Sequence, residues 1–480
     1  MPAWNLLLRV APVLAFAAGA ACEGAPPAAT GGAPSSTTTG GAATGGAATG
    51  GATGTGGAEG GAGGAPSTAP ARYPGDRWAS PITPHVADVL AAIAAQDPSR
   101  RPDVFMKVGA SETVNKNLFH CLSGGAGWKV DLAGNDALLP TLEHFRGGDA
   151  AGSTPFDRPT LAAKVGVSVG WPLSGSPSPI DQEIAAIEPR FAFVNYGTND
   201  MQQGTTHATA AFPFHAGMSA LLDALSTAGI VPIVVGLNPR DDTDSARRWV
   251  PTYDAITRGI AEARQLPFFS LYLLMKDLPG MGLVGDGVHG NTYSDGSGPA
   301  PCVFIAPALA YNHNLRNLSS ARVLDAVKRV VVDQAPALDA SPPPLVGDGT
   351  AAAPFVIDRL PFTHAATTAS VSQQVISTYP GCGAAQDESG PEVFYRLEIT
   401  APTPVRAMVF DHAGVDIDLH LLTAPSGDAC LARHDRILER TLAPGSYVFS
   451  LDTFVSGGTP QAGDYLFVVV GCEPGDPDCG

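Results

Sequence analysis

Short apolar runs alternate with longer helix-like stretches between about residues 73 and 333. The apolar runs have the length of buried strands, and they are Val104–Val108, Phe191–Asn195, Ile230–Gly236 and Pro267–Leu271. The stretches expected to form helices are Gly217–Ala228, Ser245–Arg264 and Phe304–Val332. Strands that alternate with helices favour a parallel sheet with helices on both faces. The sequence therefore predicts an α/β fold in which a parallel sheet lies between two helical layers.

Polar residues with catalytic potential follow two of these strands. Ser111, in Gly-Ala-Ser-Glu-Thr, comes after the first run, and Asn199, in Gly-Thr-Asn-Asp, comes after the second. Ligands in such sheets bind at the carboxyl ends of the strands, so these two side chains are expected to share a site. A third piece, Asp286-Gly287-Val288-His289, places an imidazole three residues after a carboxylate. Ser, His and Asp together are the components of nucleophilic acyl transfer, and Asn is a usual oxyanion donor.

Each of these residues also has an ordinary structural explanation. Ser is common at helix N-caps, which would suffice for Ser111. Gly-Asp-Gly around Asp286 is a turn signature, and both Asn199 and Asp200 suit a loop cap. The order of the three pieces along the chain favours the catalytic interpretation, except for Asp200, which we expect to be structural. Trp171 could line an acyl pocket or be a core or rim aromatic.

The three pieces, taken in order, resemble the SGNH (GDSL-type) hydrolase family over about residues 73–335. That family carries its Ser in a Gly-Asp-Ser block, Asn in Gly-x-Asn-Asp, and its remaining triad members in Asp-x-x-His. The resemblance implies a serine esterase with a three-layer α/β/α domain that needs no cofactor and no metal. It also implies that Ser111 is the nucleophile, His289 the general base, Asp286 its partner and Asn199 an oxyanion donor.

Two positions depart from the family pattern. Ala110 stands where the family has Asp. The glycine block, Lys164 to Gly170, has Lys164 in place of Asn and one extra residue between its glycines. Gly166 is therefore the oxyanion candidate and Gly170 the alternative. These departures keep open a second interpretation, in which a catalytically degenerate surface lipoprotein binds carbohydrate or protein.

The sequence pattern changes after a Pro- and Ala-rich stretch at residues 336–353. Polar and apolar residues then alternate in Asp416–Leu421 and Ser446–Leu451, and in part in Asp464–Val469. This period of two, broken by Gly, Pro and Asp, predicts an all-β sandwich over residues 354–480. Because the Pro-rich stretch is typical of a linker, we expect residues 73–335 to fold and hydrolyse small esters on their own.

Short motifs in this C-terminal region resemble the bacterial pre-peptidase C-terminal domain. They are Val415-Asp416-Ile417-Asp418-Leu419 and two copies of Gly-x-Tyr-x-Phe, at Gly445–Phe449 and Gly463–Phe467. That family is an accessory β-sandwich of secreted enzymes. The resemblance implies a non-catalytic role for residues 354–480.

Residues 1–22 have the pattern of an export signal. Arg9 is the only basic residue there, and the apolar run Val10–Ala18 is too short to span a bilayer. The end of this segment, Gly19-Ala20-Ala21-Cys22, resembles a bacterial lipobox with Gly in place of the usual Leu. We expect an exported protein, lipid-anchored through Cys22 to the cell envelope or otherwise extracellular. An ordinary cleaved signal is the alternative.

Residues 23–72 are composed almost entirely of Gly, Ala, Thr, Ser and Pro. A segment with so few large apolar residues cannot bury a core, so it is expected to be a disordered tether. The whole chain has a formal net charge of −17, which disfavours nucleic acid as a partner. The expected partner is a small-molecule or polysaccharide ester substrate.

The chain has seven cysteines, and six remain if Cys22 is lipidated. An even number in an oxidising compartment indicates disulfides. Cys121 and Cys302 are expected to pair because they are the only two in the catalytic region, and Cys472 with Cys479 would close a small tail. No group of Cys and His has the spacing of a zinc site.

Overall fold

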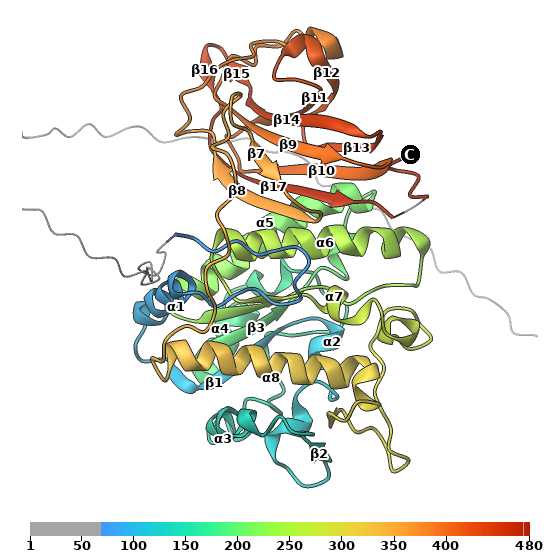
Figure 1. Cartoon of the computed structure of the whole chain (residues 1–480). Helices are drawn as coiled ribbons and strands as arrows, with labels where there is room; N and C mark the ends of the chain where they lie inside the picture. The colour runs from blue at the N-terminus through green and yellow to red at the C-terminus, as the bar shows by residue number, and fades with distance from the viewer. Residues whose placement is uncertain (1–68, 474) are drawn as a thin grey trace, which may run out of the picture. The chain divides into compact units, whose positions relative to one another are not determined.

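The computed structural model describes residues 69–473 and 475–480 (Figure 1). The predicted export signal, the lipidation site Cys22 and the tether up to residue 68 lie outside the described residues. Within the part of the chain that is described, no helix is both long and apolar enough to cross a membrane.

A four-stranded parallel sheet forms the centre of the N-terminal region, as the apolar runs predict. Its strand order is β1-β3-β4-β5, with the bounds Arg101–Gly109, Pro189–Asn195, Val231–Val235 and Phe268–Phe269. Gly109 pairs with Asn195, and Asn195 pairs with Val235, so three strands end in register. This shared edge is where the sequence places the candidate site residues.

Helices cover the sheet, with α6 on one side of the strands and α8 on the other in Figure 1. The eight α-helices of the described residues are α1 (Pro84–Gln96), α2 (Ser111–Val114), α3 (Leu139–Arg146), α4 (Pro179–Ile187), α5 (His207–Thr227), α6 (Asp244–Ala263), α7 (Leu271–Met275) and α8 (Asn312–Val331). The α/β class is thus confirmed. Two predicted helix starts are wrong: the helix expected from Gly217 begins at His207, and the one expected from Phe304 begins at Asn312.

The C-terminal region contains two sheets that enclose a shared apolar core, as the period of two predicts. Their strand orders are β13-β10-β17-β8 and β12-β11-β14-β9-β7. All pairings within them are antiparallel except that of β7 with β9. The strands are β7 (Phe355–Ile357), β8 (Phe362–Thr367), β9 (Glu392–Ile399), β10 (Thr403–Asp411), β11 (Ile417–Leu422), β12 (Cys430–His434), β13 (Ile437–Leu442), β14 (Gly445–Thr453) and β17 (Asp464–Gly471).

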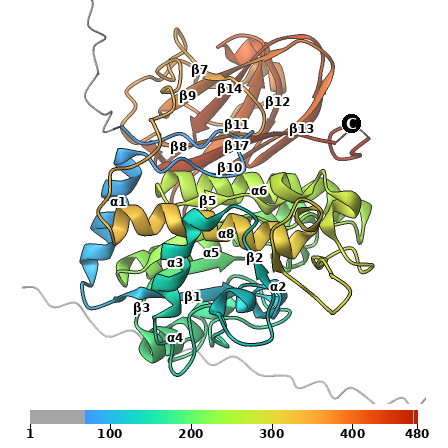
Figure 2. The ribbon, with the colours of Figure 1, turned by 60° about the horizontal axis from the view of Figure 1, so that its bottom comes forward.

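Helix α6 is buried on both sides, by the parallel sheet and by the strands of the sandwich (Figures 1 and 2). Strand β17 contributes side chains to two cores, one on each of its faces. Its residues Tyr465, Phe467 and Val469 point into the sandwich core, whereas Leu466, Val468 and Val470 belong to the core of the α/β region. The helix approaches so closely that a Cβ atom on Gly259 would lie 2.8 Å from Leu466.

This packing argues against the expectation that residues 73–335 fold on their own. One apolar core runs from the α/β region into β10 and β17, so the two regions share a core. The predicted linker is also tied down, since the backbone N–H of Ile82 donates to Asp339 Oδ2 at 2.7 Å. The predicted tether extends two residues too far, because Ala71 is buried and exchanges hydrogen bonds with the Gln265 side chain.

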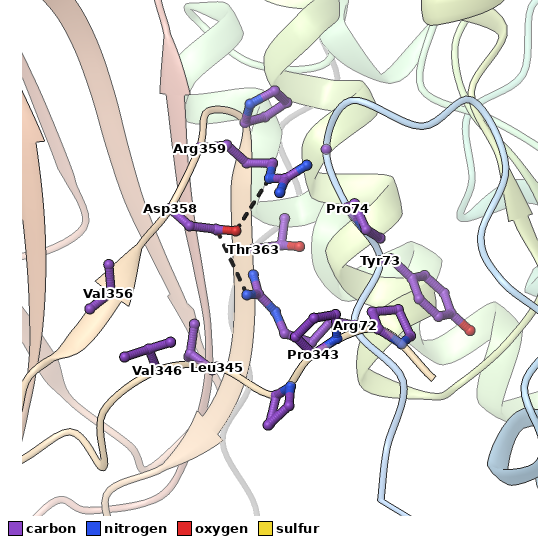
Figure 3. Close-up of a pocket in the computed structure, with 14 residues that line it drawn as sticks. Arg72, Tyr73, Pro74, Pro343, Leu345, Val346, Val356, Asp358, Arg359 and Thr363 are labelled. Carbon is purple, nitrogen blue, oxygen red and sulfur yellow. Dashed lines mark hydrogen bonds and ion pairs between the residues drawn. The ribbon is translucent and has the colours of Figure 1, made fainter. Parts of the chain in front are cut away.

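Three segments from both regions meet around a cavity of about 150 Å³ (Figure 3). They are residues 72–75, 342–346 and 356–363. Arg72 and Arg359 both face the carboxylate of Asp358, at 3.7 and 3.3 Å. The N-terminal entry of the α/β region is thereby held against the sandwich.

A buried carboxyl at this interface predicts how stability depends on pH. Burial raises the pKa of Glu262 from 4.5 to about 7, although Thr363 and the backbone N–H of Tyr73 donate to its carboxylate. A raised pKa means that the folded state holds the proton more tightly. Protonated Glu262 thus contributes on the order of 3 kcal/mol to the free energy of unfolding. This contribution is present in full below about pH 4.5 and is lost as pH rises through about 7.

We therefore expect the melting temperature to fall between about pH 5 and 8, and to fall less in Glu262→Gln. Thermal unfolding followed by circular dichroism at several pH values gives the slope of melting temperature against pH for the wild type and for Glu262→Gln. Equal slopes for the two proteins would show that Glu262 does not hold a proton in the folded state.

Candidate active site

The sequence motifs meet at the carboxyl edge of the parallel sheet. Strand β1 ends at Gly109, and Ser111 begins the four-residue helix α2 two residues later. A Cβ atom on Gly109 would lie 2.0 Å from Thr113 Oγ1 and 2.8 Å from the Asn195 carbonyl oxygen, so only glycine fits this turn. The tight turn directs the start of α2 toward the edge of the sheet.

Ser111, His289 and Asp286 form a continuous hydrogen-bonded chain. Ser111 Oγ lies 2.9 Å from His289 Nε2, although the two residues are 178 positions apart. On the other side of the ring, His289 Nδ1 lies 2.7 Å from Asp286 Oδ2. This is the arrangement in which an imidazole can take a proton from a hydroxyl while a carboxylate orients the ring.

Asp286 is held in place by the loop that carries it. Its Oδ1 atom accepts hydrogen bonds from the backbone N–H groups of His289 and Val288, at 3.0 and 2.9 Å. The backbone of His289, then its side chain, and then the backbone of Val288 lower the pKa of Asp286 to about 2. The carboxylate is therefore ionised at any pH near neutrality, as an orienting group requires.

Asn199 and Asp200 connect the loop after β3 to the glycine block around residues 167–169. Asn199 Nδ2 donates to the carbonyl oxygen of Val167 at 2.8 Å. Buried Asp200 accepts from the backbone N–H groups of Val169 and Gly197, at 2.8 and 3.0 Å. Asp200 thus has the structural position expected of it. A carboxamide NH₂ has two donor hydrogens, so Asn199 keeps one beyond the bond to Val167.

The glycine block lies beside the end of β1. Gly109 bridges to Ala163, and the backbone N–H of Lys164 donates to the carbonyl oxygen of Gly109 at 3.2 Å. Gly166 follows with a φ of +78°, and both Gly166 and Gly170 are exposed with open space beside them. Both glycines therefore remain candidates for the oxyanion site. Trp171 is half-buried, with Lys164 Nζ 6.0 Å from its ring centre.

Glu112, next to Ser111, makes contacts that no sequence motif predicts. Its Oε1 atom accepts from the backbone N–H of Gly290 at 2.9 Å, and Oε2 accepts from Arg316 Nη1 at 3.2 Å. Ala110, which replaces the family's Asp, makes no side-chain cap for α2. The helix that carries Ser111 is thus held by Glu112 through partners far away in the sequence.

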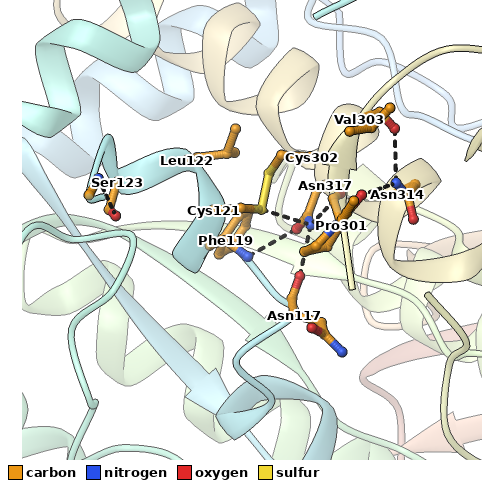
Figure 4. The surroundings of a disulfide bond; sticks show 12 residues. Asn117, Phe119, Cys121, Leu122, Ser123, Pro301, Cys302, Val303, Asn314 and Asn317 are labelled. Carbon is orange, nitrogen blue, oxygen red and sulfur yellow. Dashed lines mark hydrogen bonds between the residues drawn. A yellow bond between two sulfur atoms is a disulfide. The ribbon is translucent and has the colours of Figure 1, made fainter. Parts of the chain in front are cut away.

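A disulfide braces the segments that follow the candidate nucleophile and base (Figure 4). Cys121 pairs with Cys302, as predicted, and Cys382–Cys430 and Cys472–Cys479 are the other two disulfides of the described residues. Beside the first, Asn317 Nδ2 donates to the carbonyl oxygens of Asn117 and Pro301, at 2.8 and 3.1 Å. Strand β2 (Val130–Asp131) also pairs with β6 (Cys302–Val303) here.

Comparison with known families agrees with the motifs. Residues 159–293 match the model of the GDSL-like Lipase/Acylhydrolase family. The match confirms the predicted resemblance and supports an ester-cleaving enzyme. The GDSL-like match includes Gly166, Asn199, Asp286 and His289 but begins after Ser111. Ser111 is therefore connected to the site by its hydrogen bond to His289. No curated protein sequence matches the chain.

Solved structures of esterases are similar to parts of the chain. Axe2, an acetylxylan esterase from Geobacillus stearothermophilus, is 16% identical and covers 46% of this chain and 93% of its own, with a TM-score of 0.30. A two-domain esterase active on acetylated mannans is 12% identical and covers 77% of this chain and 92% of its own, with a TM-score of 0.25.

Part of the chain is also similar to the pre-peptidase C-terminal domain of collagenase from Bacillus anthracis. The identity is 13%, the coverage is 23% of this chain and 89% of that one, and the TM-score is 0.16.

Two arginines support the site loops without any motif of their own. Buried Arg316 in α8 also donates to Asn195 Oδ1, at the end of β3, at 3.0 Å. Buried Arg240 donates to the carbonyl oxygen of Thr198, beside Asn199, at 2.9 Å. Neither lies within a recognisable pattern, and their partners are 121 and 42 positions away. Only the folded chain brings these residues together.

Proposed function

We propose that this protein is a serine esterase that hydrolyses carboxylic esters with Ser111 as nucleophile. The observation that carries this proposal is the chain of hydrogen bonds from Ser111 Oγ through His289 to Asp286, at 2.9 and 2.7 Å. The GDSL-like match, which includes His289 and Asp286, supports it.

The proposed reaction proceeds through an acyl-enzyme. Ser111 Oγ attacks the ester carbonyl carbon while His289 Nε2 takes the hydroxyl proton and then returns it to the leaving alcohol. Water, deprotonated by the same nitrogen, then attacks the acyl carbon. The bond to Ser111 Oγ breaks, His289 returns the proton to this oxygen, and the acid is released. Asp286, whose pKa is about 2, stays ionised throughout and stabilises the imidazolium.

The proposed oxyanion site combines three donors: the backbone N–H groups of Ser111 and Gly166 and the side-chain amide of Asn199. Such donors act on the negative charge that develops on the carbonyl oxygen in the transition state. The bond from Asn199 to Val167 fixes the orientation of the amide in advance, which is what this kind of stabilisation requires.

The proposed substrates are short-chain acyl esters, including O-acetyl groups on carbohydrate. The side chains of His289 and Asp286 are 40% and 49% exposed, so the site is open to solvent. A long acyl chain needs an enclosed apolar pocket, whereas an acetyl group on a bulky alcohol needs access from outside. We further propose that the protein is exported and anchored through Cys22, because of the signal-like residues 1–22.

A series of p-nitrophenyl esters from acetate to palmitate, assayed beside acetylated xylan, tests this function. We expect the highest kcat/KM for acetyl to butyryl esters and release of acetate from the polysaccharide. A rate that rises steadily with chain length would contradict the proposed substrate class. No turnover of any ester would favour the degenerate, carbohydrate- or protein-binding alternative.

A further inference from the structure

The carboxylate of Glu112 connects the two halves of the site. Glu112 is covalently next to Ser111, and its hydrogen-bond donor, Gly290, is covalently next to His289. Two parallel hydrogen bonds therefore join the same two segments, Ser111 Oγ to His289 Nε2 at 2.9 Å and Gly290 N to Glu112 Oε1 at 2.9 Å. The second bond does not take part in proton transfer, but it joins the segments on which the first one depends.

The segment that carries Ser111 needs such a support. Helix α2 has four residues, and its N-cap residue, Ala110, makes no side-chain hydrogen bond. A single turn of helix is not stable by itself, because its first hydrogen bonds do not compensate for the ordered backbone. The position of Ser111 therefore depends on contacts from outside the helix.

The carboxylate of Glu112 is itself anchored to the sheet. Its side chain is 12% exposed, and that of its partner Arg316 is 2% exposed. Arg316 Nη2 donates to Asn195 Oδ1, and Asn195 Nδ2 donates to the carbonyl oxygen of Gly236 at 2.9 Å. The anchor thus extends from Glu112 across α8 to the ends of β3 and β4.

We propose that Glu112 is a positioning residue, which fixes the distance between Ser111 Oγ and His289 Nε2 through its bond to the backbone of Gly290. This inference rests on the proposed esterase function. Misplacement of reacting groups by about 1 Å costs up to about a hundredfold in rate. Glu112 touches neither the ester nor the transferred proton, so its effect falls on kcat and leaves substrate binding unchanged.

Three substitutions distinguish the bond to Gly290 from the ion pair with Arg316. Glu112→Ala removes both and is expected to lower kcat about 10- to 100-fold, with KM within about twofold of the wild type. Glu112→Gln keeps an oxygen that can accept from Gly290 and is expected to retain more of kcat. Glu112→Asp keeps the charge but is one methylene shorter, so it is expected to lose more than Gln.

Steady-state kinetics with p-nitrophenyl acetate, on protein whose fold is checked by circular dichroism, gives the result. The control is Glu388→Gln, which alters a fully buried carboxyl group beside Arg433 in the sandwich, and it should keep the wild-type kcat. If Glu112→Ala does not fold, the order of Gln and Asp decides.

Retention of kcat in Glu112→Ala, equal losses in Gln and Ala, or a smaller loss in Asp than in Gln would each overturn the inference. The proposed esterase function is tested separately by Ser111→Ala. If Ser111→Ala abolishes turnover while the Glu112 variants keep it, only the positioning role fails. If Ser111→Ala itself remains active, the esterase site has been assigned to the wrong residue.

Discussion

Replacement of Ser111 by alanine is expected to lower kcat for ester hydrolysis by about a thousandfold or more. In the proposed reaction the hydroxyl oxygen forms the acyl-enzyme, and alanine has no atom that could accept the acyl group. His289→Ala should have a similar effect, since the hydroxyl then has no base 2.9 Å away. Rates of p-nitrophenyl acetate hydrolysis by purified variants measure both losses.

The double variant provides the sharper test of a shared mechanism. Residues that act as one unit are not additive, so Ser111→Ala with His289→Ala should lose little beyond either single change. Ser99→Ala, at an exposed serine just before β1, at the end of that strand opposite to Ser111, is the control and should keep full activity. Multiplicative losses in the double variant would mean that the two residues act in separate steps.

Removal of residues 354–480 is expected to leave a protein that does not fold. The deletion strips α6 of Met408, Phe410, Leu466 and the other apolar side chains of β10 and β17 that complete its core. An apolar helix face of this size, suddenly exposed, promotes aggregation. We expect residues 69–353 to be insoluble or to lack a cooperative thermal transition, and to have no esterase activity.

A single substitution in the full-length chain tests the interface between α6 and the sandwich without removing any strand. Arg406 in β10 is fully buried, donates to Thr252 of α6 at 3.0 Å and stacks on the Trp249 ring at 3.5 Å. Its other partners are the carboxylates of Glu439, Asp476 and Asp478. Arg406→Ala leaves these charges unpaired, so a loss of about 3–5 kcal/mol in unfolding free energy is expected. A soluble, active fragment 69–353 together with a stable Arg406→Ala protein would contradict the shared core.

The fold class was predictable because apolar runs of strand length are a local signal. The runs at Val104–Val108 and Phe191–Asn195 lie inside β1 and β3. The shared core was not predicted, although β17 contains a clue. Its sequence Asp464–Gly471 is nearly continuous in apolar residues, which is the pattern of a strand buried on both faces. The second face of β17 is covered by α6, which lies about 200 residues earlier in the chain. No local sequence pattern shows that these two elements pack together.

The candidate site was predictable where chemistry restricts residue type within a short block. Asp286 and His289 are three positions apart, so their contact follows from one loop. Glu112 is different, because its partners Gly290 and Arg316 are 178 and 204 positions away. A glutamate next to a serine has no distinctive pattern, and its role becomes visible only when the sheet brings α2 and α8 together.

Covalent labelling with a fluorophosphonate, followed by peptide mass spectrometry, shows directly whether Ser111 is an activated nucleophile. Fluorophosphonates react rapidly only with a serine that a neighbouring base activates. We expect stoichiometric phosphonylation of Ser111 with parallel loss of esterase activity, and no labelling in His289→Ala. Rapid labelling of another residue, or background labelling of a protein that still hydrolyses esters, would contradict this assignment.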